Sequence, residues 1–374
     1  MLRRAWGSAF VHRDLRAAIV PWIVARVLVV GALALARVVF DDIGSGPRPV
    51  QLRQGLFAWD AAFYRDLAEH GYSALGRPAL RFFPLVPLLA RGLGTVLLDH
   101  TAVALIVLVN GSALVLGALL HRLVVRETGD DGLAARATWF IAVFPPAAVL
   151  VMGYAEATAM ALAVGTFLAM RTRRWWLAAV TAFLVGLARP VGVLLALPLA
   201  IEATRDWRTT SSSERIQRIV AVLAPVGGVA AYLVWAGARF GDAFEPITYQ
   251  NRATLRGGFV DPFTRVVDAV GELFDGRAGP IVHVAWAAGF LLLALVVARR
   301  LPSSYVAYGA VTVVVALSAH NLDSLERYAM SAFPLIIGLG IVTSPHDAER
   351  GALGIAAGGL VGYSLAAFLG LAVP

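Results

Sequence analysis

Cysteine and lysine are both absent from this chain of 374 residues. Without cysteine, the protein can form neither a disulfide framework nor a thiolate metal site, and it has no cysteine nucleophile. Without lysine, all 32 basic residues are arginines, and with 24 acidic residues they give a net charge of +8. This charge does not require a nucleic acid partner, because arginine in cytoplasmic loops is what membrane orientation demands.

Charged residues are scarce, at 15% of the chain, whereas hydrophobic residues make up 59% of it. The mean hydropathy is +0.74. A soluble core cannot hide this much apolar surface in a chain of this length, so most of it must face lipid. The composition therefore predicts an all-α polytopic membrane protein.

Apolar segments alternate with arginine clusters, and this alternation predicts the topology. Four arginines precede the first apolar segment and place the N-terminus in the cytoplasm. They are Arg3, Arg4, Arg13 and Arg16. We expect one domain, residues 1–374, with about eleven membrane helices, an outer C-terminus and a location in the plasma membrane. The expected spans are residues 17–40, 101–120, 135–152, 154–170, 176–188, 190–201, 218–238, 283–297, 305–319, 328–342 and 353–371.

Two long loops are expected on the outer side. The first, residues 41–100, includes an apolar segment at 82–98 that is short and interrupted by Pro84, Pro87 and Arg91. We therefore expect a re-entrant or interfacial helix there instead of a crossing. The second, residues 239–280, is expected to be a polar loop.

The outer turns collect a different set of residues from the inner turns. Inner turns hold mainly loose arginine runs, such as residues 171–174 and 205–218. The outer turns hold Asp60, Glu156, Arg189, His320, Asp323, Glu326 and Arg327. Each residue taken alone fits a solvated helix cap, but their shared side predicts that function lies on the outer face.

The stretch at residues 55–66 combines Trp59 and Asp60 with several aromatic residues. A carboxylate near a bilayer is costly unless it is hydrated, paired or used. The stretch fits either an interfacial amphipathic helix or a catalytic loop. Arg26, inside the first span, is expected to face other helices or to snorkel, and contact with a lipid phosphate is the alternative.

Several short motifs occur along the chain in the same order as in a known protein family. The first outer loop holds FAWDAAFY at 57–64, LAEHGY at 67–72 and RFFPLVPL at 81–88. Further along are FPP at 144–146, YAE at 154–156, ARPVG at 188–192, ERY at 326–328 and FP at 333–334. Together they resemble the PIG-V-like mannosyltransferases, which depend on polyprenyl-phosphate-mannose and have a GT-C fold. In this chain Ala155 and Ala157 flank Glu156, and Pro190 follows Arg189, which departs from the family pattern.

The resemblance implies an inverting transfer of mannose from a polyprenyl-phosphate donor to a glycan or glycolipid hydroxyl. Inversion needs one carboxylate as general base. Asp60 is the expected base and Asp42 the alternative. Arginine suits the donor phosphate because its planar fork can bind two oxygens. The implied substrate-binding residues are Trp59, Tyr64, Glu156, Arg189, His320, Glu326, Arg327 and Tyr328.

The same residues also fit structural roles and other classes of protein. An arginine at 189 or 327 can instead pair with a glutamate to pin helices, and His320 can cap a helix. No residue cluster has metal-ligand spacing, so we expect neither a metal nor another cofactor. A transporter or flippase, or a non-catalytic lipid-phosphate-binding subunit, remains as the competing class. The acceptor is left open.

Overall fold

The computed structural model describes residues 2–44, 46–277 and 279–374, with side chains described from residue 12 onward. Arg3 and Arg4 lie outside the described side chains. Within the described residues the regular structure is helical, and strand pairing is limited to an isolated bridge between Phe259 and Ala319. The predicted all-α class is confirmed.

The chain forms two compact units. Unit 1 comprises Met1–Glu69, Val86–Gly165 and Leu339–Pro374, and unit 2 comprises His70–Leu85 and Thr166–Gly338. The division falls within helices α8 (Glu156–Arg171) and α17 (Phe333–Val342).

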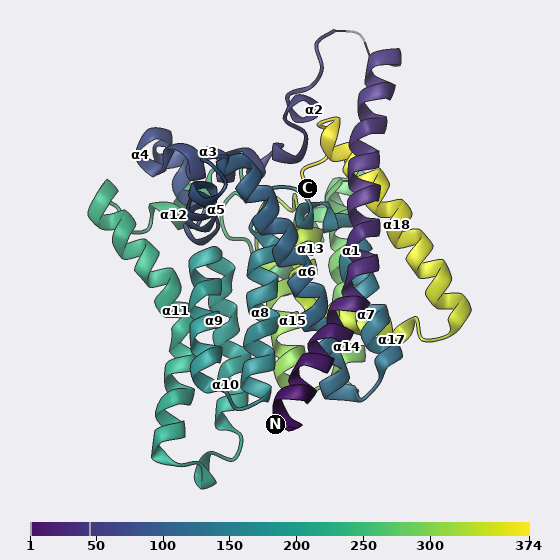
Figure 1. Cartoon of the computed structure of the whole chain (residues 1–374). Coiled ribbons are helices and arrows are strands. Elements are labelled where there is room, and N and C mark those ends of the chain that lie inside the picture. Colours follow the sequence, from purple (N-terminus) through teal and green to yellow (C-terminus); the bar gives the residue numbers. More distant parts are fainter. Residues whose placement is uncertain (1, 45, 278) are drawn as a thin grey trace. The chain divides into compact units, whose positions relative to one another are not determined.

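Unit 1 is built on the long helix α1, which packs on α6, α7 and α18. Figure 1 shows α18 beside α1. The other helices of unit 1 are short and connect these four. In chain order the elements are α1 (Leu2–Ile43), α2 (Val50–Gln54), η1 (Gly55–Phe57), α3 (Asp60–His70), α5 (Leu85–Val96), α6 (Thr101–Thr128), α7 (Asp131–Val143), η3 (Pro145–Leu150) and α18 (His346–Phe368).

Unit 2 is built on helix α11, which packs closely against α9 and α10, while α14 packs on α13, α15 and α16. Glycines permit the close approach of α9 and α11, because a Cβ at Gly186 or Gly228 would overlap the backbone of the other helix. The elements are α4 (Tyr72–Leu75), η2 (Arg77–Arg81), α9 (Trp175–Ala188), η4 (Pro190–Leu195), α10 (Ala196–Thr204), η5 (Trp207–Thr209), α11 (Ser212–Phe240), α12 (Glu245–Thr248), η6 (Tyr249–Asn251), α13 (Pro262–Phe274), α14 (Gly279–Ala298), α15 (Ser303–Leu317) and α16 (Leu325–Met330).

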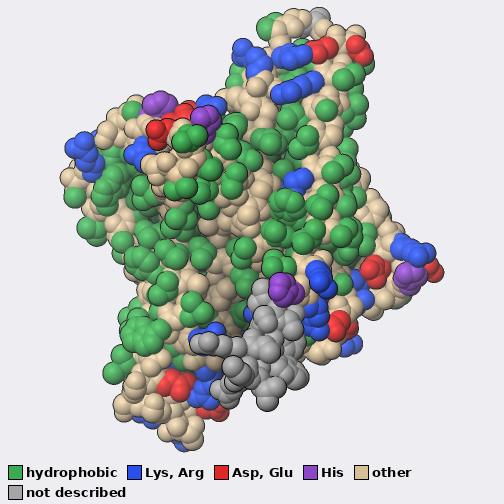
Figure 2. Space-filling model, viewed as in Figure 1, with side chains coloured by type: hydrophobic (Ala, Val, Ile, Leu, Met, Phe, Trp, Pro, Cys, Tyr) green, Lys and Arg blue, Asp and Glu red, His purple; other side chains and the backbone are tan. Residues whose placement is uncertain are grey.

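Among the described residues, five helices are long and apolar enough to cross a membrane. They are His12–Ile43 within α1, α6, α11, α14 and α18, and each matches a predicted span. Figure 2 shows hydrophobic side chains along most of the visible side of α1 and charged side chains near its end beside α2. The multi-pass class is thus supported.

The predicted count of eleven spans is not confirmed, because proline-containing turns break several of the apolar segments. The segment at 135–152 ends its α-helix at Val143, before Pro145, and continues as the 3-10 helix η3. The segment at 328–342 is divided between α16 and α17. The segment at 82–98 forms only the 12-residue helix α5, as expected for a helix that does not cross.

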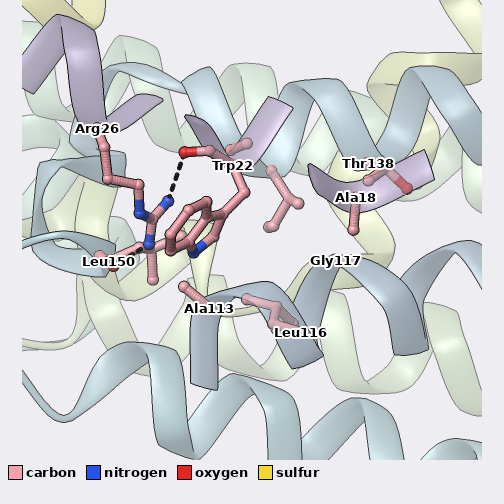
Figure 3. A pocket seen from close by; sticks show the side chains of 10 residues that line it. Ala18, Trp22, Arg26, Ala113, Leu116, Gly117, Thr138 and Leu150 are labelled. Atoms are coloured by element: carbon pink, nitrogen blue, oxygen red, sulfur yellow. Dashed lines mark hydrogen bonds between the residues drawn. The ribbon is translucent and has the colours of Figure 1, made fainter. Parts of the chain in front are cut away.

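Arg26 faces other helices, as one of the expected alternatives states. Its guanidinium donates to Asn110 Oδ1 at 2.8 Å and to the carbonyls of Leu150 at 2.9 Å and Trp22 at 3.2 Å. It also lies over the Trp22 ring, beside a small pocket between α1, α6 and α7 (Figure 3). These contacts satisfy a charge that lipid could not solvate, so Arg26 joins α1 to α6.

The arginine turns expected to be loose are paired instead. In unit 2, buried Glu202 accepts hydrogen bonds from Arg171 at 3.0 Å and from Ser304 Oγ at 2.6 Å. Buried Arg218 contacts Glu214 at 2.8 Å. A buried carboxylate is retained only where donors compensate its desolvation, so these pairs join the helices that carry them.

Candidate functional site

Asp60 begins helix α3, and the preceding residue has an unusual backbone. Trp59 has a φ of 60°, in the left-handed region that a bulky side chain rarely adopts. The Trp59 indole Nε1 donates to the Ala367 carbonyl of α18 at 2.9 Å, which helps to hold this turn. Backbone strain of this kind persists only where surrounding contacts impose it, and it concentrates at functional sites.

The Trp-Asp motif and the YAE motif meet in unit 1, although 94 residues separate Asp60 from Tyr154. The backbone N–H of Asp60 donates to Tyr154 Oη at 3.3 Å, and the Gly153 N–H donates to the Leu56 carbonyl at 3.0 Å. A Cβ at Gly153 would lie 3.4 Å from Ala61 Cβ, so the two segments are in contact. The structure therefore joins two motifs that the sequence only places in order.

Both predicted site acids of unit 1 lie at helix N-termini. Asp60 is half-buried at the start of α3, and Glu156 is buried, 2% exposed, at the start of α8. A helix N-terminus stabilises a nearby carboxylate through its unpaired N–H groups and the helix dipole. Tyr64, one turn after Asp60 on α3, is buried. Unit 1 thus holds carboxylates in a mostly apolar setting.

The alternative base, Asp42, is exposed near the end of α1. Its neighbour Asp41 receives two hydrogen bonds from Arg48, at 2.8 and 2.5 Å. The surroundings of Asp42 and Asp60 therefore differ, because Asp60 lies beside two further motif residues, Trp59 and Tyr154.

Three arginines of unit 2 surround the ring of Tyr328. The guanidinium carbons of Arg189 and Arg327 each lie 5.1 Å from the ring centroid, and that of Arg256 lies 4.6 Å from it. Arg327 Nη2 also donates to Tyr328 Oη at 3.4 Å. An aromatic face attracts cations, which lowers the cost of placing these like charges together. The concentration of guanidinium groups makes this cluster suited to a phosphate.

Helix α16, which carries Arg327 and Tyr328, also begins after a strained residue. Ser324 has a φ of 65°, again in the left-handed region. Each unit therefore places such a residue just before the helix that carries its charged motif.

The loop at residues 239–280, which was predicted to lie on the outer side, is tied to the segment that precedes α16. Backbone N–H groups of His320 and Asn321 donate to the carbonyls of Gly258 at 3.2 Å and Arg256 at 2.9 Å. Gly257 has a φ of 69°, and a Cβ there would overlap the His320 side chain. The backbone of His320 therefore helps to position the loop that carries Arg256, while its side chain is exposed.

Glu326 is held by a residue outside the predicted site. Its Oε1 lies 2.5 Å from Nδ1 of His283, near the start of α14. Glu326 is 3% exposed, and within the described residues its buried Oε2 has no hydrogen-bond partner. A buried carboxylate oxygen of this kind is costly unless a donor reaches it. Glu326 thus pins α14 to α16 through one oxygen and can accept a ligand hydroxyl through the other.

The predicted site residues fall into two sets. Unit 1 holds Trp59, Asp60, Tyr64 and Glu156, and unit 2 holds Arg189, His320, Glu326, Arg327 and Tyr328. Arg256 and His283 were not among the residues predicted from the sequence. Arg256 lies in a loop without a motif, so no local signal marks it. His283 was detectable as an ionisable residue inside an apolar segment.

The described residues contain no group of three His, Asp or Glu side chains close enough to hold a metal ion. The expectation that the protein uses no metal stays a prediction.

Comparison with protein-family models and with curated proteins gives no match. Among solved structures, the chain is similar to the crystal structure of the Archaeoglobus fulgidus oligosaccharyltransferase in complex with Zn and sulfate. The sequence identity is 16% and the TM-score 0.40. The similarity covers 78% of this chain and 44% of the solved one, so the chain spans less than half of that protein's length. A similarity of this size leaves the function to be argued from the residues of the chain itself.

Proposed function

We propose that this protein is an inverting mannosyltransferase with a GT-C fold. It moves mannose from polyprenyl-phosphate-mannose to a hydroxyl group of an acceptor glycan or glycolipid on the extracytoplasmic face of the plasma membrane. The observation that supports this most directly is the gathering of Arg189, Arg256 and Arg327 at Tyr328 in a multi-pass helical protein. A lipid-linked phosphate is an anion that such a protein can meet at its surface, and guanidinium groups suit it.

In the proposed reaction, one carboxylate acts as the base and several arginines stabilise the leaving phosphate. Asp60 takes the proton of the acceptor hydroxyl while the hydroxyl oxygen attacks the anomeric carbon of mannose. The bond between that carbon and the phosphate oxygen breaks, and the phosphate leaves with the electron pair. Arg189, Arg256 and Arg327 stabilise the charge of the departing phosphate. A single displacement inverts the anomeric centre, which agrees with the β-linked donor and α-linked product of the family that the sequence resembles.

The remaining motif residues bind the substrates in this proposal. Glu156 and Glu326 accept hydrogen bonds from sugar hydroxyls, and Trp59, Tyr64 and Tyr328 provide aromatic surface for the sugar. His320 contacts the donor headgroup from the segment between α15 and α16. No metal takes part, because arginine side chains can neutralise a monophosphate leaving group.

The test is direct transfer with the purified protein. Radiolabelled mannose on a synthetic polyprenyl phosphate is supplied in detergent together with a membrane glycolipid extract as acceptor. We expect label in the acceptor from this donor, and none when GDP-mannose or polyprenyl-phosphate-glucose replaces it. Tight donor binding without transfer to any acceptor or to water would instead identify a non-catalytic subunit. Movement of intact donor across a vesicle membrane would identify a flippase.

A further inference from the structure

Helix α13 lies between residues 239 and 280, where the sequence predicts only a polar loop. Its 13 residues are Pro262–Phe274, and Asp261 caps its N-terminus. The Asp261 carboxylate accepts hydrogen bonds from the backbone N–H groups of Phe263 at 3.0 Å and Thr264 at 3.1 Å. Proline at the first helical position and a carboxylate cap are strong local start signals, so this helix has a defined beginning.

One exposed side of α13 is apolar. Phe263, Val267, Val270 and Phe274 follow one another at intervals of four, three and four residues, which places them on one face of a helix. Phe263 is 82% exposed, Val267 69% and Phe274 86%. An exposed apolar stripe of this size is unfavourable in water. This face therefore requires an apolar environment.

The next face around the helix is polar and also exposed. It holds Thr264, Asp268, Gly271 and Asp275, each one residue after a member of the apolar stripe. One residue corresponds to a rotation of roughly 100° about a helix axis, so the two exposed faces point in clearly different directions.

The third face is covered by the protein. Arg265 and Ala269 are buried, and α13 packs on α14 and α15. Arg265 Nη1 donates to Glu272 Oε1 at 3.1 Å, so this arginine has a partner within the helix. The packed side of α13 is therefore fixed, and the two other sides are left for two different surroundings.

The neighbouring helix indicates what the apolar surroundings are. Helix α14 begins five residues after α13 ends and is among the helices able to cross a membrane. Its exposed side chains include Val282, Leu292 and Leu295, which lipid must cover if α14 spans the bilayer. Because α13 packs on α14, the apolar stripe of α13 adjoins a lipid-facing helix.

We propose that α13 is an interfacial helix that lies along the membrane surface. Its face of Phe263, Val267, Val270 and Phe274 inserts among lipid acyl chains, its face of Asp268 and Asp275 meets water, and its third face packs on unit 2. A helix with one apolar and one polar exposed side is stable in this position, at the boundary between headgroups and acyl chains. The proposal does not depend on the enzymatic activity proposed above.

The absence of native cysteine makes a precise test possible, because a single introduced cysteine can carry a fluorescent reporter. Val267→Cys and Asp268→Cys are adjacent exposed positions on the apolar and polar faces. Each full-length variant is labelled with an NBD fluorophore and placed in lipid nanodiscs, with or without lipids that carry a nitroxide on the acyl chain. Phe274→Cys and Asp275→Cys provide a second matched pair near the end of the helix.

We expect blue-shifted emission and at least threefold quenching by the nitroxide lipids at 267 and 274. Emission typical of water and little quenching are expected at 268 and 275. Equal quenching within each pair, or water-like emission at all four positions, would refute the proposal. Blue-shifted emission without lipid quenching at 267 and 274 would also refute it, since a protein partner or a second copy of the chain would then cover this face.

Discussion

The two units hold their charged motif residues by different physical means. In unit 1, Asp60 and Glu156 each begin a helix, where the N-terminus stabilises a carboxylate. In unit 2, Arg189, Arg256 and Arg327 come from three separate segments and share one aromatic ring. The acids are thus supported by their own helices, whereas the arginines are brought together only by the packing of distant segments.

Both acids and two of the three arginines lie in sequence motifs and were predicted, whereas Arg256 lies in a loop without a motif and was not. A carboxylate at a helix start needs a turn before the helix. Trp59 in its left-handed conformation provides that turn directly before α3, and the hydrogen bond from its indole to the Ala367 carbonyl helps to hold it. Three guanidinium groups repel one another, and the shared aromatic face of Tyr328 lowers the cost of holding them together. Helix starts therefore support the two predicted acids of unit 1, whereas the packing of distant segments brings the three arginines of unit 2 together.

The prediction with the largest expected effect concerns the side of the membrane on which each end of α11 in unit 2 lies. Ser212 begins α11, and Ser73 Oγ accepts a hydrogen bond from Arg239 near the other end of that helix, at 3.2 Å. A helix of 29 residues is roughly 43 Å long, enough to separate the two serines by a bilayer. We expect an impermeant thiol reagent applied outside intact cells to label Ser73→Cys and not Ser212→Cys. Labelling of Ser212→Cys alone would place the arginine cluster on the wrong face for this function.

Asp60→Asn should give the largest loss of activity. The amide keeps the shape of the side chain but cannot take a proton, and loss of a general base typically lowers the rate by about a hundredfold to ten-thousandfold. Donor binding, measured as the thermal shift that donor induces, should stay near that of the wild type. Asp66→Asn on the same helix α3 is the control and should retain activity.

An Asp60→Asn protein that folds, binds donor and turns over within about threefold of the wild type would exclude Asp60 as the base. So small a change corresponds to well under about 1 kcal/mol of barrier. Asp42 would then be tested in the same way.

Arg189→Lys and Arg327→Lys should affect unit 2 in a different way from the acid variant. Each retains its charge but loses the planar fork, and a charge-assisted hydrogen bond contributes about 1.5–3 kcal/mol, so kcat/KM should fall about tenfold to a hundredfold. Donor-induced thermal shifts should shrink in parallel. Arg215→Lys, at the start of α11, serves as the control. If both variants bind donor and turn it over normally, these arginines have a structural role.

Arg256→Lys should have a smaller effect of the same kind. Its side chain is half-buried, and its Nη2 contact with the Ala316 carbonyl is long, at 3.5 Å, so solvent competes for it. We expect a fall in kcat/KM of about threefold to tenfold, since solvent-exposed charges contribute less than buried ones. Arg252→Lys is the matched control, because Arg252 lies in the same loop over Tyr249. Equal losses in both variants would show that Arg256 acts only through the loop.

Tyr154→Phe should have the smallest effect and test the joining of motifs in unit 1. It removes the hydroxyl that accepts from the Asp60 N–H, and a hydrogen bond of this kind contributes about 0.5–1.5 kcal/mol. We expect a two- to tenfold loss of turnover with donor affinity unchanged. Tyr363→Phe, which removes an exposed hydroxyl on α18, should leave turnover intact. A loss of donor affinity without a loss of turnover would contradict a role in positioning Asp60.

Much of the fold could be predicted from the sequence because apolar length is a local property. The five long apolar helices match predicted spans within a few residues for α14 and more loosely for α6 and α11. The count of spans could not be predicted, since an apolar run does not reveal where its helix is interrupted. The segment at 328–342, divided between α16 and α17, illustrates this limit. Helix α13, with its apolar, polar and packed faces, was likewise not predicted, because the polar residues of the same loop lower the average hydrophobicity around its apolar stripe.

The sequence by itself determined the helical membrane class and the positions of the motifs. These depend on composition and on short-range signals that act within a turn or two of helix. Only the tertiary structure decided that Tyr154 meets Asp60, that His283 holds Glu326 and that Arg256 reaches Tyr328. Each of those contacts joins residues more than 40 positions apart, and the packing of whole helices, which no local pattern encodes, brings them together.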